Sequence, residues 1–477
     1  MRASLAQLAI ALSGARLTGE ADFDGAFEGV STDSRNAAPG ALFVALRGEQ
    51  FDGHDFLPQL AGANKIAAVI AEQLPPGWTL PAIVVPDTLT ALGQAGHFWR
   101  AQFAIPVIGV TGSNGKTTVK EMIAAILAAA WGEDARLATR GNLNNEIGVP
   151  LTLMRLEPGH QAAVIEMGMN HPGEIARLAA ITAPTIGMVN NAQREHQEFM
   201  HTVEAVALEN GAVLAALPPE GIAVYPADDV YTPLWAGLAG TRRSLTFGFD
   251  AALANVSCTH RAGDFGSVLA VTVRVDGAGS RQFTQQFNVR LAAAGLHNVR
   301  NALAAIACAT AAGVQQDAIV RGLEAFAPVT GRLQQHRALS GASIIDDSYN
   351  ANPDSVRAAI DVLAQAGAPR LLVLGDMGEV GTQGRQFHEE IAAYATACGI
   401  ERVLVTGELT RFMVGTVGAQ GAGVQHFEQF DDLLAALDRA LGSTSDATVL
   451  VKGSRFMKME RVVRHLLGLH NTGKEFH

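Results

Sequence analysis

Apolar residues recur along the chain in short runs separated by turns and helical stretches, and these runs fall into three blocks. In the first block, residues 1–105, the runs "GALFVAL", "KIAAVIAE" and "AIVVP" are typical of short buried strands between glycine turns. An amphipathic helix is expected before Gly14, with apolar residues at Leu5, Leu8, Ala9 and Leu12. The block therefore predicts a small α/β domain whose last element is a helix.

The second block, residues 106–328, begins with the strongest strand-to-helix signal in the sequence. The run Val107–Val110 is short, apolar and followed by turn residues, as a buried strand should be. Apolar residues then return with the spacing of a helix face, at Val119, Met122, Ile123, Ile126, Leu127 and Ala130. The runs "AAVIEMG", "TIGMVNN" and "GIAVYP" alternate with helical stretches and predict a mostly parallel sheet. Two later runs, "LAVTVRVDG" and "RQFTQQFNVRL", predict an antiparallel pair added to that sheet.

The third block, residues 329–477, repeats the alternation of strand and helix. Its runs "ASIIDDSY", "RLLVLGDMGE", "RVLVTGE" and "TVLVKGS" predict a second doubly wound unit of the Rossmann type. The junction "FAPVTGRL" contains the proline and glycine that suit a hinge. The fold class expected from the whole pattern is α/β, with a small N-terminal domain, a central parallel-sheet domain and a C-terminal Rossmann-like domain.

Composition narrows the class of protein. No apolar run among the 477 residues reaches the roughly 18 residues of a membrane span, so no membrane insertion is expected. The net charge of −11 argues against a nucleic-acid-binding surface. The three cysteines, Cys258, Cys308 and Cys398, lie far apart without metal-ligand spacing, which favours a reducing compartment. The amphipathic N-terminal stretch leads into folded-looking sequence and is not typical of a signal peptide, so a cytoplasmic protein is expected.

The turn "TGSNGKTT" lies between the first strand and helix of the second block. A helix that begins at such a turn points its free N–H groups at a bound anion, so the turn predicts a nucleoside-triphosphate site. Lys116 would reach the β- and γ-phosphates, and the Thr117 hydroxyl would coordinate Mg²⁺. The strict pattern G-x-x-x-x-G-K-[ST] is not met, because Val110 stands where its first glycine belongs. A motor, a kinase, a switch or a ligase could each contain this loop. The residues expected to bind the nucleotide are Thr111, Gly112, Ser113, Asn114, Gly115, Lys116, Thr117 and Thr118.

Other polar clusters follow predicted strands or stand at the start of predicted helices. Glu166 ends a strand, where open α/β sheets bind ligands, and it could coordinate Mg²⁺ unless it is a solvated strand-end glutamate. His196 follows the next strand, although a lone histidine there is more often structural than a ligand. Amides gather in a glycine-rich turn and at the start of an alanine-rich helix: Asn142, Asn144, Asn145, Asn298 and Asn301. The turn suggests substrate recognition, whereas helix capping is the alternative for Asn298.

In the third block the stretch "DDSYNANPDS" follows a strand and suggests a ribose or base contact. Pro353 is expected at the first position of a helix, with Asn352 as its cap.

Together these motifs resemble the Mur ligase family, the ATP-dependent amide-bond ligases that build the peptide of the bacterial cell wall. "TGSNGKTT" is similar to the phosphate loop of this family, which folylpolyglutamate synthetases share. "STDSR" and "GALFVALRGEQFDGHDF" look like its uridine-nucleotide-binding domain. "TRGNLNNEIGVPLTL", "EMGMNHPGEI", "DDSYNANPDS", "LGDMGE" and "LVKGSR" look like the members that add a D-alanyl-D-alanine dipeptide.

The resemblance implies a reaction and its participants. ATP would phosphorylate the carboxylate of UDP-N-acetylmuramoyl-tripeptide, and the amine of D-alanyl-D-alanine would displace phosphate, with Mg²⁺ as the metal. The expected enzyme is a monomer in which residues 1–105 bind the UDP-sugar-peptide, residues 106–328 bind ATP, and residues 329–477 bind the dipeptide and close on ATP. The alternative is another amino-acid-adding Mur ligase or a folylpolyglutamate-type ligase. A P-loop switch or transport ATPase is a remote alternative, because the chain offers no long helical arms and no basic nucleic-acid surface.

The resemblance also implies roles for individual residues. Those expected in catalysis are Lys116, Glu166, His196, Asn298 and Arg332. The metal ligands would be Thr117, Glu166 and His196, with His196 on a second Mg²⁺. The nucleotide would also contact Asn298, Asn301, Arg332, Asp347, Tyr349 and Asn350, with Lys452 a weaker candidate. The other substrates would contact Ser31, Ser34, Arg35, Asn142, Asn144 and Asn145.

One position departs from the family pattern. Many Mur ligases have a carbamylated lysine that helps to position the second Mg²⁺, and Asn210 stands at that position here. An amide cannot be carbamylated, and the adjacent Glu209 should point about 100° away on a helix. A second Mg²⁺ held without any modified lysine is therefore expected.

Overall fold

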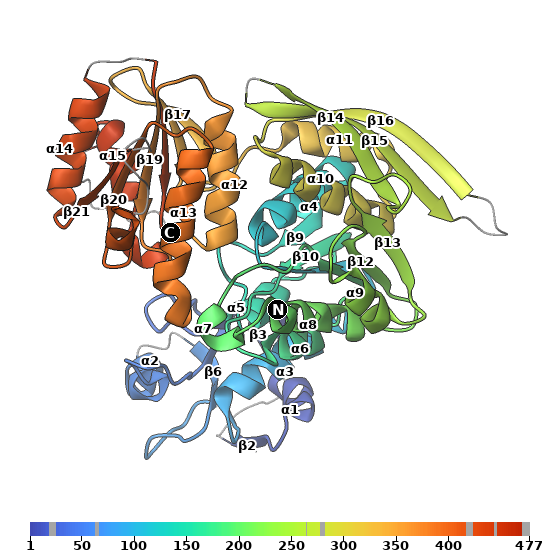
Figure 1. Ribbon diagram of the computed structural model, residues 1–477. Helices are drawn as coiled ribbons and strands as arrows, with labels where there is room; N and C mark the ends of the chain where they lie inside the picture. Colours follow the sequence, from blue (N-terminus) through green and yellow to red (C-terminus); the bar gives the residue numbers. More distant parts are fainter. Residues whose placement is uncertain are drawn as a thin grey trace.

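The computed structural model describes residues 1–18, 25–62, 66–263, 265–276, 282–415, 423–442 and 446–469. Within them the strands form a nine-stranded, a six-stranded, a five-stranded and a two-stranded sheet. Figure 1 shows the three larger sheets in succession along the chain, each with its own helices. The expected α/β class is confirmed.

The N-terminal part contains a five-stranded sheet in the order β2-β7-β6-β5-β4, with β2 antiparallel to its neighbour and a separate β1–β3 pair. Its strands are β1 (Arg2–Ser4), β2 (Arg16–Thr18), β3 (Ala26–Glu28), β4 (Val30–Ser31), β5 (Ala41–Val44), β6 (Ile66–Ala71) and β7 (Ala82–Val84). Its helices are α1 (Leu5–Ala11), η1 (Gly53–Phe56), α2 (Leu57–Gly62) and α3 (Thr88–Arg100). The three predicted strands are β5, β6 and β7, and the two predicted helices are α1 and α3. Lys65 and Arg281, the first residues of two predicted stretches, lie outside the described residues.

The central nine-stranded sheet has the order β16-β15-β14-β13-β12-β11-β8-β10-β9. Its strands are β8 (Val107–Thr111), β9 (Arg136–Ala138), β10 (Ala162–Glu166), β11 (Ile186–Val189), β12 (Ile222–Pro226), β13 (Arg243–Phe247), β14 (Val256–Gly263), β15 (Gly266–Asp276) and β16 (Gln282–Leu291). Its helices are α4 (Lys116–Trp131), η2 (Glu133–Ala135), α5 (Gly148–Leu153), α6 (Glu174–Thr182), α7 (Gln197–Met200), α8 (Val203–Ala215), α9 (Thr232–Ala239), α10 (Leu296–Ala311) and α11 (Gln316–Ala325).

Strand β8 lies in the middle of this sheet and is buried on both faces. Ile108 and Val110 belong to the apolar core shared with α4, α10 and α11, whereas Val107 packs with α6 and α8 on the opposite face. The continuous apolar run of β8 is what a strand covered on both sides requires. The predicted antiparallel pair is β15 and β16, and β14, which was not predicted, joins them to β13. Figure 1 shows these long strands extending away from the rest of the molecule.

The C-terminal six-stranded sheet has the order β17-β18-β22-β19-β20-β21, with only β17 antiparallel. Its strands are β17 (Gln334–Arg337), β18 (Ser343–Asp347), β19 (Arg370–Gly375), β20 (Arg402–Thr406), β21 (Gly423–Phe427) and β22 (Thr448–Lys452). Its helices are α12 (Pro353–Ala364), η3 (Gly381–Gln383), α13 (Gly384–Ala397), η4 (Thr410–Met413), α14 (Phe430–Leu441), η5 (Arg455–Met457) and α15 (Glu460–Leu466). The four predicted strands are present, and the edge strands β17 and β21 were not predicted. Their half-exposed residues lack the continuous apolar runs of the central strands.

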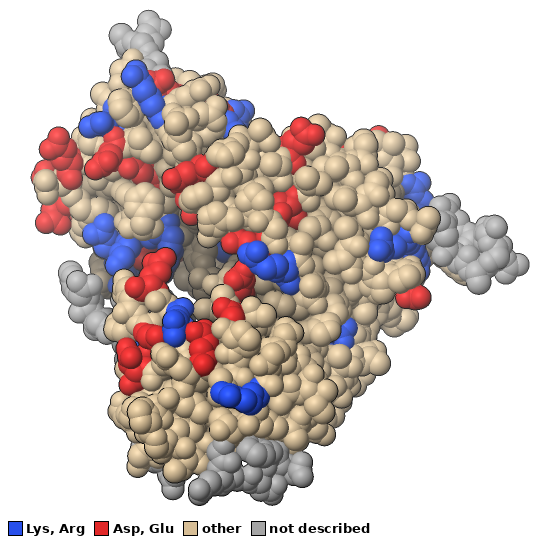
Figure 2. Space-filling view, turned by 90° about the horizontal axis from the view of Figure 1, so that it is seen from below, with Lys and Arg blue, Asp and Glu red and all other residues tan. Residues whose placement is uncertain are grey.

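No helix in the described part of the chain is both long and apolar enough to cross a membrane. Cys258, Cys308 and Cys398 are free thiols. Figure 2 shows one face of the molecule, on which lysines and arginines stand in small groups among acidic residues around a central hollow.

Candidate active site at the phosphate loop

The phosphate loop, residues 111–118, joins β8 to α4 at the carboxyl edge of the central sheet. The parallel register sets Val110 of β8 beside Glu166 of β10, and Thr111 beside Val189 of β11. Polar residues that follow these three neighbouring strands therefore converge at one edge, where open α/β sheets bind ligands. Gly115, with a φ of 81°, precedes α4 and leaves the free N–H groups of that helix directed into the loop.

Amide side chains from neighbouring elements hold the loop in shape. The Asn114 N–H donates to Oδ1 of Asn191 at 2.9 Å, and Nδ2 of Asn190 donates to the Asn114 carbonyl at 2.7 Å. The Gly112 N–H donates to Oδ1 of Asn210 at 3.0 Å. These bonds use groups of the loop that face the protein and so hold its backbone from the protein side.

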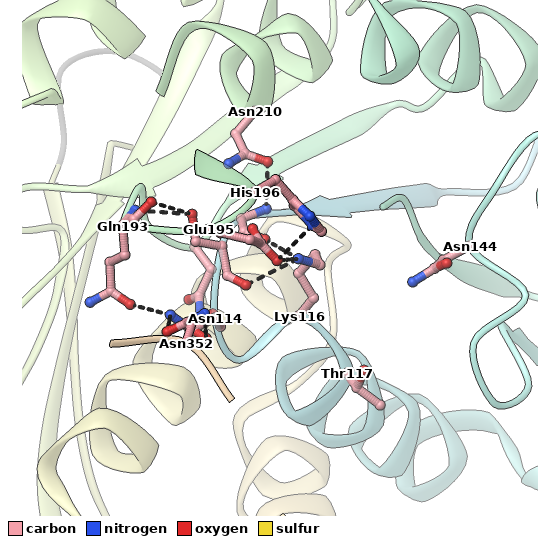
Figure 3. A network of polar contacts seen from close by, with 12 residues as sticks. Asn114, Lys116, Thr117, Asn144, Gln193, Glu195, His196, Asn210 and Asn352 are labelled. Atoms are coloured by element: carbon pink, nitrogen blue, oxygen red, sulfur yellow. Dashed lines mark hydrogen bonds and ion pairs between the residues drawn. The ribbon is translucent and has the colours of Figure 1, made fainter. Parts of the chain in front are cut away.

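Lys116 lies across the loop. Its Nζ donates to the carbonyls of Gly112 and Ser113, at 2.5 and 3.1 Å, and to Oε1 of Glu195 at 3.0 Å. Figure 3 shows Lys116, Glu195 and His196 pointing toward one another. The ammonium group is thus fixed within the predicted phosphate site, with Glu195 as its counter-ion.

On the other side of the loop, Thr117 and Glu166 form a compact pair. The Thr117 hydroxyl donates to Oε1 of Glu166 at 3.1 Å, and Nδ2 of Asn144 donates to the same oxygen at 2.9 Å. Glu166 is 2% exposed, and its Oε2 has no hydrogen-bond partner among the described residues. A buried carboxylate oxygen beside a hydroxyl matches the oxygen ligands that Mg²⁺ prefers. These two residues therefore fit the predicted metal.

His196 is placed between two carboxylates. Its Nε2 lies 3.5 Å from Oε1 of Glu195. Its Nδ1 lies 2.5 Å from Oε2 of Glu379, but this oxygen is out of line with the N–H bond, so the contact is an ion pair without hydrogen-bond geometry. Burial disfavours the charged imidazole, but Glu195 and Glu379 outweigh it and raise the pKa of His196 to about 9. Burial likewise opposes ionisation of Glu195, yet Lys116 and His196 hold the pKa of that carboxyl below its usual range. Within the described residues, no cluster of three or more His, Cys, Asp or Glu side chains is arranged around a metal position.

The C-terminal domain contacts the loop directly. Nδ2 of Asn352 donates to Oδ1 of Asn114 at 2.9 Å, and Asn352 also caps α12 through the Ser355 N–H. The predicted cap and the proline at the start of α12 are both confirmed. Arg194, which follows β11, donates to Asp354 of α12 and Glu390 of α13. Two domains therefore meet at the phosphate loop.

Residues of the C-terminal domain predicted to contact nucleotide lie together. The Arg332 guanidinium stacks 4.3 Å from the centre of the Tyr349 ring, and its Nε has no hydrogen-bond partner among the described residues. Nζ of Lys452 bonds Oδ2 of Asp347 and the carbonyl of Asn350. Burial raises the pKa of Asp347, although the nearby Lys452 opposes this shift.

The asparagines of α10 lie on the side of the helix that faces the loop. Nδ2 of Asn301 donates to Oδ1 of Asn298 at 3.1 Å, and Nδ2 of Asn190 donates to Oδ1 of Asn301 at 2.9 Å. Gly295, not Asn298, caps α10, so the capping interpretation of Asn298 was wrong. Nδ2 of Asn298 instead donates to the carbonyl of Ala294, one turn back along the chain.

Most of these groups line one cavity of about 1360 Å³. The predicted residues that line it are Ser113, Asn114, Gly115, Lys116, Thr117, Thr118, Asn142, Asn144, Asn145, Glu166, His196, Asn298, Asn301, Arg332, Asp347, Tyr349, Asn350 and Lys452. Thr111 and Gly112 do not line the cavity: the Thr111 hydroxyl donates to the carbonyls of Met188 and Asn210, and the Gly112 N–H donates to Asn210. Each of the two therefore helps to hold the loop in place.

Three predicted substrate residues are not part of this cavity. Ser31, Ser34 and Arg35 lie at the end of β4 in the N-terminal domain, where Arg35 pairs with Asp33 at 2.9 Å and leaves 84% of its side chain exposed. Their predicted contact with a uridine nucleotide stays a prediction.

The structure assigns Glu209 and Asn210 to other partners. Both oxygens of Glu209 accept backbone N–H groups at the start of α6, from Gly173 at 2.8 Å and Ile175 at 2.7 Å. Asn210 accepts the Gly112 N–H, as described above. Both carboxylate oxygens of Glu209 therefore bind a helix N-terminus, and Glu209 does not replace the carbamylated lysine that the family resemblance implies at position 210.

Arg194, Glu195 and Glu379 were not identified from the sequence. For Arg194 and Glu195 the available signal was the polar run "VNNAQREHQEF" after a buried strand, from which only His196 was selected. Glu379 ends the run "LGDMGE", which was used only for the family resemblance. Their partners lie far away in the sequence, so the pairings depend on how the domains dock.

Comparison with known proteins decides the family. Residues 26–99, 110–309 and 331–455 match models described as "Mur ligase family, catalytic domain", "Mur ligase middle domain" and "Mur ligase, glutamate ligase domain". The UDP-N-acetylmuramoyl-tripeptide–D-alanyl-D-alanine ligase of Escherichia coli is 39% identical over 444 residues, which cover 92% of this chain and 93% of that protein. The chain belongs to the Mur ligase family.

Solved structures agree with this assignment. The Mur ligase described here superposes on a crystal structure of MurF from Acinetobacter baumannii with a TM-score of 0.89 and 32% identity, covering 98% of this chain and 99% of that one. The MurF ligase from Thermotoga maritima, solved in complex with ADP, gives a TM-score of 0.80 at 25% identity, with 92% and 97% of the two chains covered. Membership of a ligase family does not favour the switch or transport ATPase.

Proposed function

We propose that this Mur ligase joins D-alanyl-D-alanine to UDP-N-acetylmuramoyl-tripeptide and converts ATP to ADP and phosphate. The proposal rests on the similarity, along nearly the whole chain, to relatives named UDP-N-acetylmuramoyl-tripeptide–D-alanyl-D-alanine ligase. The relative from Haemophilus influenzae is 34% identical over 98% of this chain and 98% of its own length. The cavity at the phosphate loop supplies a place where a triphosphate, a carboxylate and an amine could meet.

The reaction must replace a poor leaving group. A carboxylate oxygen of the tripeptide attacks the γ-phosphorus of ATP, the bond to the β-bridging oxygen breaks, and ADP leaves. The amine nitrogen of the dipeptide then attacks the resulting acyl phosphate, and the tetrahedral species loses phosphate and a proton to give the amide. Because all participants except the amine are anionic, neutralisation of charge should supply most of the catalysis.

The residues around the loop suit that task. Lys116 is held within 3.1 Å of the loop carbonyls, so its charge is in place before nucleotide binds. The free N–H groups of α4 and the guanidinium of Arg332 add positive potential from the central and C-terminal domains. Asn298, Asn301, Asp347, Tyr349 and Asn350 would then bind the nucleoside.

Mg²⁺ fits the Thr117–Glu166 pair, because a buried carboxylate oxygen there has no other partner. When bound, the ion would offset negative charge on the phosphates. For a second Mg²⁺ we retain His196 as the candidate ligand, which would have to lose the proton that Glu195 and Glu379 stabilise. Asn144 would orient Glu166 through its hydrogen bond.

The remaining assignments complete the proposal. We infer that residues 1–105 bind the uridine nucleotide through Ser31, Ser34 and Arg35, that residues 106–328 bind ATP, and that residues 329–477 bind the dipeptide. We also infer that the protein is a monomer that acts in the cytoplasm without nucleic acid, and three free cysteines support a reducing compartment.

Release of phosphate from the purified protein tests the function. We expect ATP to be consumed only when both the nucleotide-tripeptide and D-alanyl-D-alanine are present, with the lysine and diaminopimelate forms of the tripeptide compared. Single amino acids in place of the dipeptide serve as the control for an amino-acid-adding ligase. Steady ATP hydrolysis without the amine, or preference for a single amino acid, would contradict the proposal.

A further inference from the structure

Arg194 joins two domains near the phosphate loop through both its side chain and its backbone. Its guanidinium donates through Nη2 to Oδ1 of Asp354 at 2.6 Å and through Nη1 to Oε2 of Glu390 at 2.8 Å. Its own backbone N–H donates to Oδ2 of Asp354 at 2.9 Å. The guanidinium also lies 5.2 Å from the centre of the Phe387 ring. One residue is thus fixed at both its backbone and its side chain by α12 and α13.

These ion pairs are more than surface contacts. The side chains of Arg194, Asp354 and Glu390 are 22%, 23% and 30% exposed, so solvent screens them less than a fully exposed pair. Forked bonds from a guanidinium to a carboxylate also fix geometry as well as contributing energy. Hydrogen bonding to Arg194 outweighs burial and holds the pKa of Glu390 below its usual range.

The residues that follow Arg194 reach the active site. Glu195, the next residue, accepts Nζ of Lys116 at 3.0 Å and is 13% exposed. His196 contacts Glu379, and the Glu198 N–H donates to the Glu379 carbonyl at 3.3 Å. Residues 194–198 therefore touch the C-terminal domain at several points and the phosphate-loop lysine at one.

We infer that Arg194 is a positioning residue: held by Asp354 and Glu390, it sets Glu195 against Lys116, so that docking of the C-terminal domain completes the lysine side of the phosphate site. Lys116 has two other partners in the loop, but both are carbonyls of its own turn. Glu195 is the contact through which a second domain influences where the ammonium group lies.

A double-mutant cycle tests whether Arg194 acts through Glu195. We expect Arg194→Gln and Glu195→Gln each to lower kcat/KM for ATP about tenfold, and the double variant to be no worse than either single variant, because residues acting in one network are not additive. Losses that multiply to about a hundredfold would mean that Arg194 acts independently of Glu195, and would overturn the inference. Arg194→Lys, which keeps the charge without the fork, should give an intermediate loss.

Arg357→Gln is the matched control. Arg357 donates to Oε1 of the same Glu390 at 2.8 Å, but it lies on α12 and so joins residues within the C-terminal domain only. We expect Arg357→Gln to change kcat/KM less than twofold. A loss equal to that of Arg194→Gln would show that Glu390 alone matters and would overturn the inference.

Two readouts do not need the ligation substrates. Small-angle scattering should give a larger radius of gyration for Arg194→Gln than for wild type, and calorimetry with the ATP analogue AMP-PNP and Mg²⁺ should give weaker binding. Unchanged values in both would also overturn the inference. The kinetic arm rests on the proposed function, whereas these two arms do not. If wild type fails to ligate but Arg194→Gln still shows both effects, the result counts against the function alone.

Discussion

The two sides of the phosphate loop are built differently. Thr117, Glu166 and Asn144 all belong to the central domain and bond one another. Thr117 lies at the start of α4, Glu166 at the end of β10 and Asn144 in the loop before α5. Lys116 and Glu195 also belong to the central domain. However, the segment that contains Glu195 and His196 is bonded to the C-terminal domain, at α12, α13 and Glu379. The metal side, made of Thr117, Glu166 and Asn144, is therefore complete within one domain. The lysine side, made of Lys116 and Glu195, depends on contacts with a second domain. One loop can therefore have a fixed half and a half whose geometry depends on the position of a second domain.

Replacing Lys116 should have the largest effect. Lys116→Ala should lower kcat by about 10²–10³, because removal of one preorganised electrostatic group costs about 3–4 kcal/mol. Phosphate release at saturating ATP measures the loss, and unchanged circular dichroism would show that the fold is intact. Arg385→Ala, which removes a surface cation paired with Glu389, is the control and should leave the rate unchanged. Near-wild-type ligation by Lys116→Ala would remove the lysine from the mechanism.

Variants on the metal side should change the Mg²⁺ requirement of the enzyme but not the relative position of its domains. Glu166→Gln should raise the Mg²⁺ concentration needed for half-maximal activity about 100-fold, and Asn144→Ala, which only frees Glu166, about tenfold. Titration of Mg²⁺ at fixed ATP measures both, and small-angle scattering without metal should match wild type. A change in scattering for either variant would show that Glu166 or Asn144 also depends on domain docking.

A smaller effect is expected where α12 meets the loop. Asn352→Ser keeps a good helix cap but is too short to reach Asn114, so it removes two interdomain hydrogen bonds, each worth about 0.5–1.5 kcal/mol. We expect KM for ATP to rise a few-fold with no change in thermal stability. Asn352→Ala should add a loss of about 1 kcal/mol in stability from the missing cap. Equal kinetics for Asn352→Ser and wild type would mean that this contact does not support docking.

The smallest effect concerns Asn210. Because Asn210 holds the Gly112 N–H and Glu209 is bound to the start of α6, bicarbonate should have no target at this position. Activity in buffer freed of carbon dioxide should equal that in ordinary buffer, and Asn210→Lys should bring no gain unless bicarbonate is supplied. Loss of activity that bicarbonate restores in wild type would show that another lysine is modified.

The sequence predicted the parts of the site that depend on local pattern. The apolar run of β8 and the helical spacing after Lys116 require a strand, a turn and a helix, and Glu166 follows because parallel strands end at one edge. Arg194 and Glu195 could not be predicted in the same way. Arg194 and its partners are separated by 160 and 196 residues, and no periodicity encodes how two domains dock.

The fold shows the same limit. Strands covered on both faces, such as β18 and β22, carry the apolar runs by which they were recognised. The edge strand β17, "QQHR", has no such run, because one of its sides is free of a neighbouring strand and its residues are half-exposed. Its place in the sheet depends on pairing with β18, which a local pattern does not reveal.

The glycines of the phosphate loop affect how readily resistance to an inhibitor of this protein could arise by mutation. Gly112 and Gly115 have φ values of 135° and 81°, and a Cβ added at Gly115 would lie 2.5 Å from Oδ1 of Asn301 and 2.8 Å from Nδ2 of Asn190. Any side chain there would be strained and would collide with amides that hold the loop. A compound that bound the backbone of this loop would contact positions that cannot change without loss of the loop itself. Resistance would have to arise at positions outside these glycines.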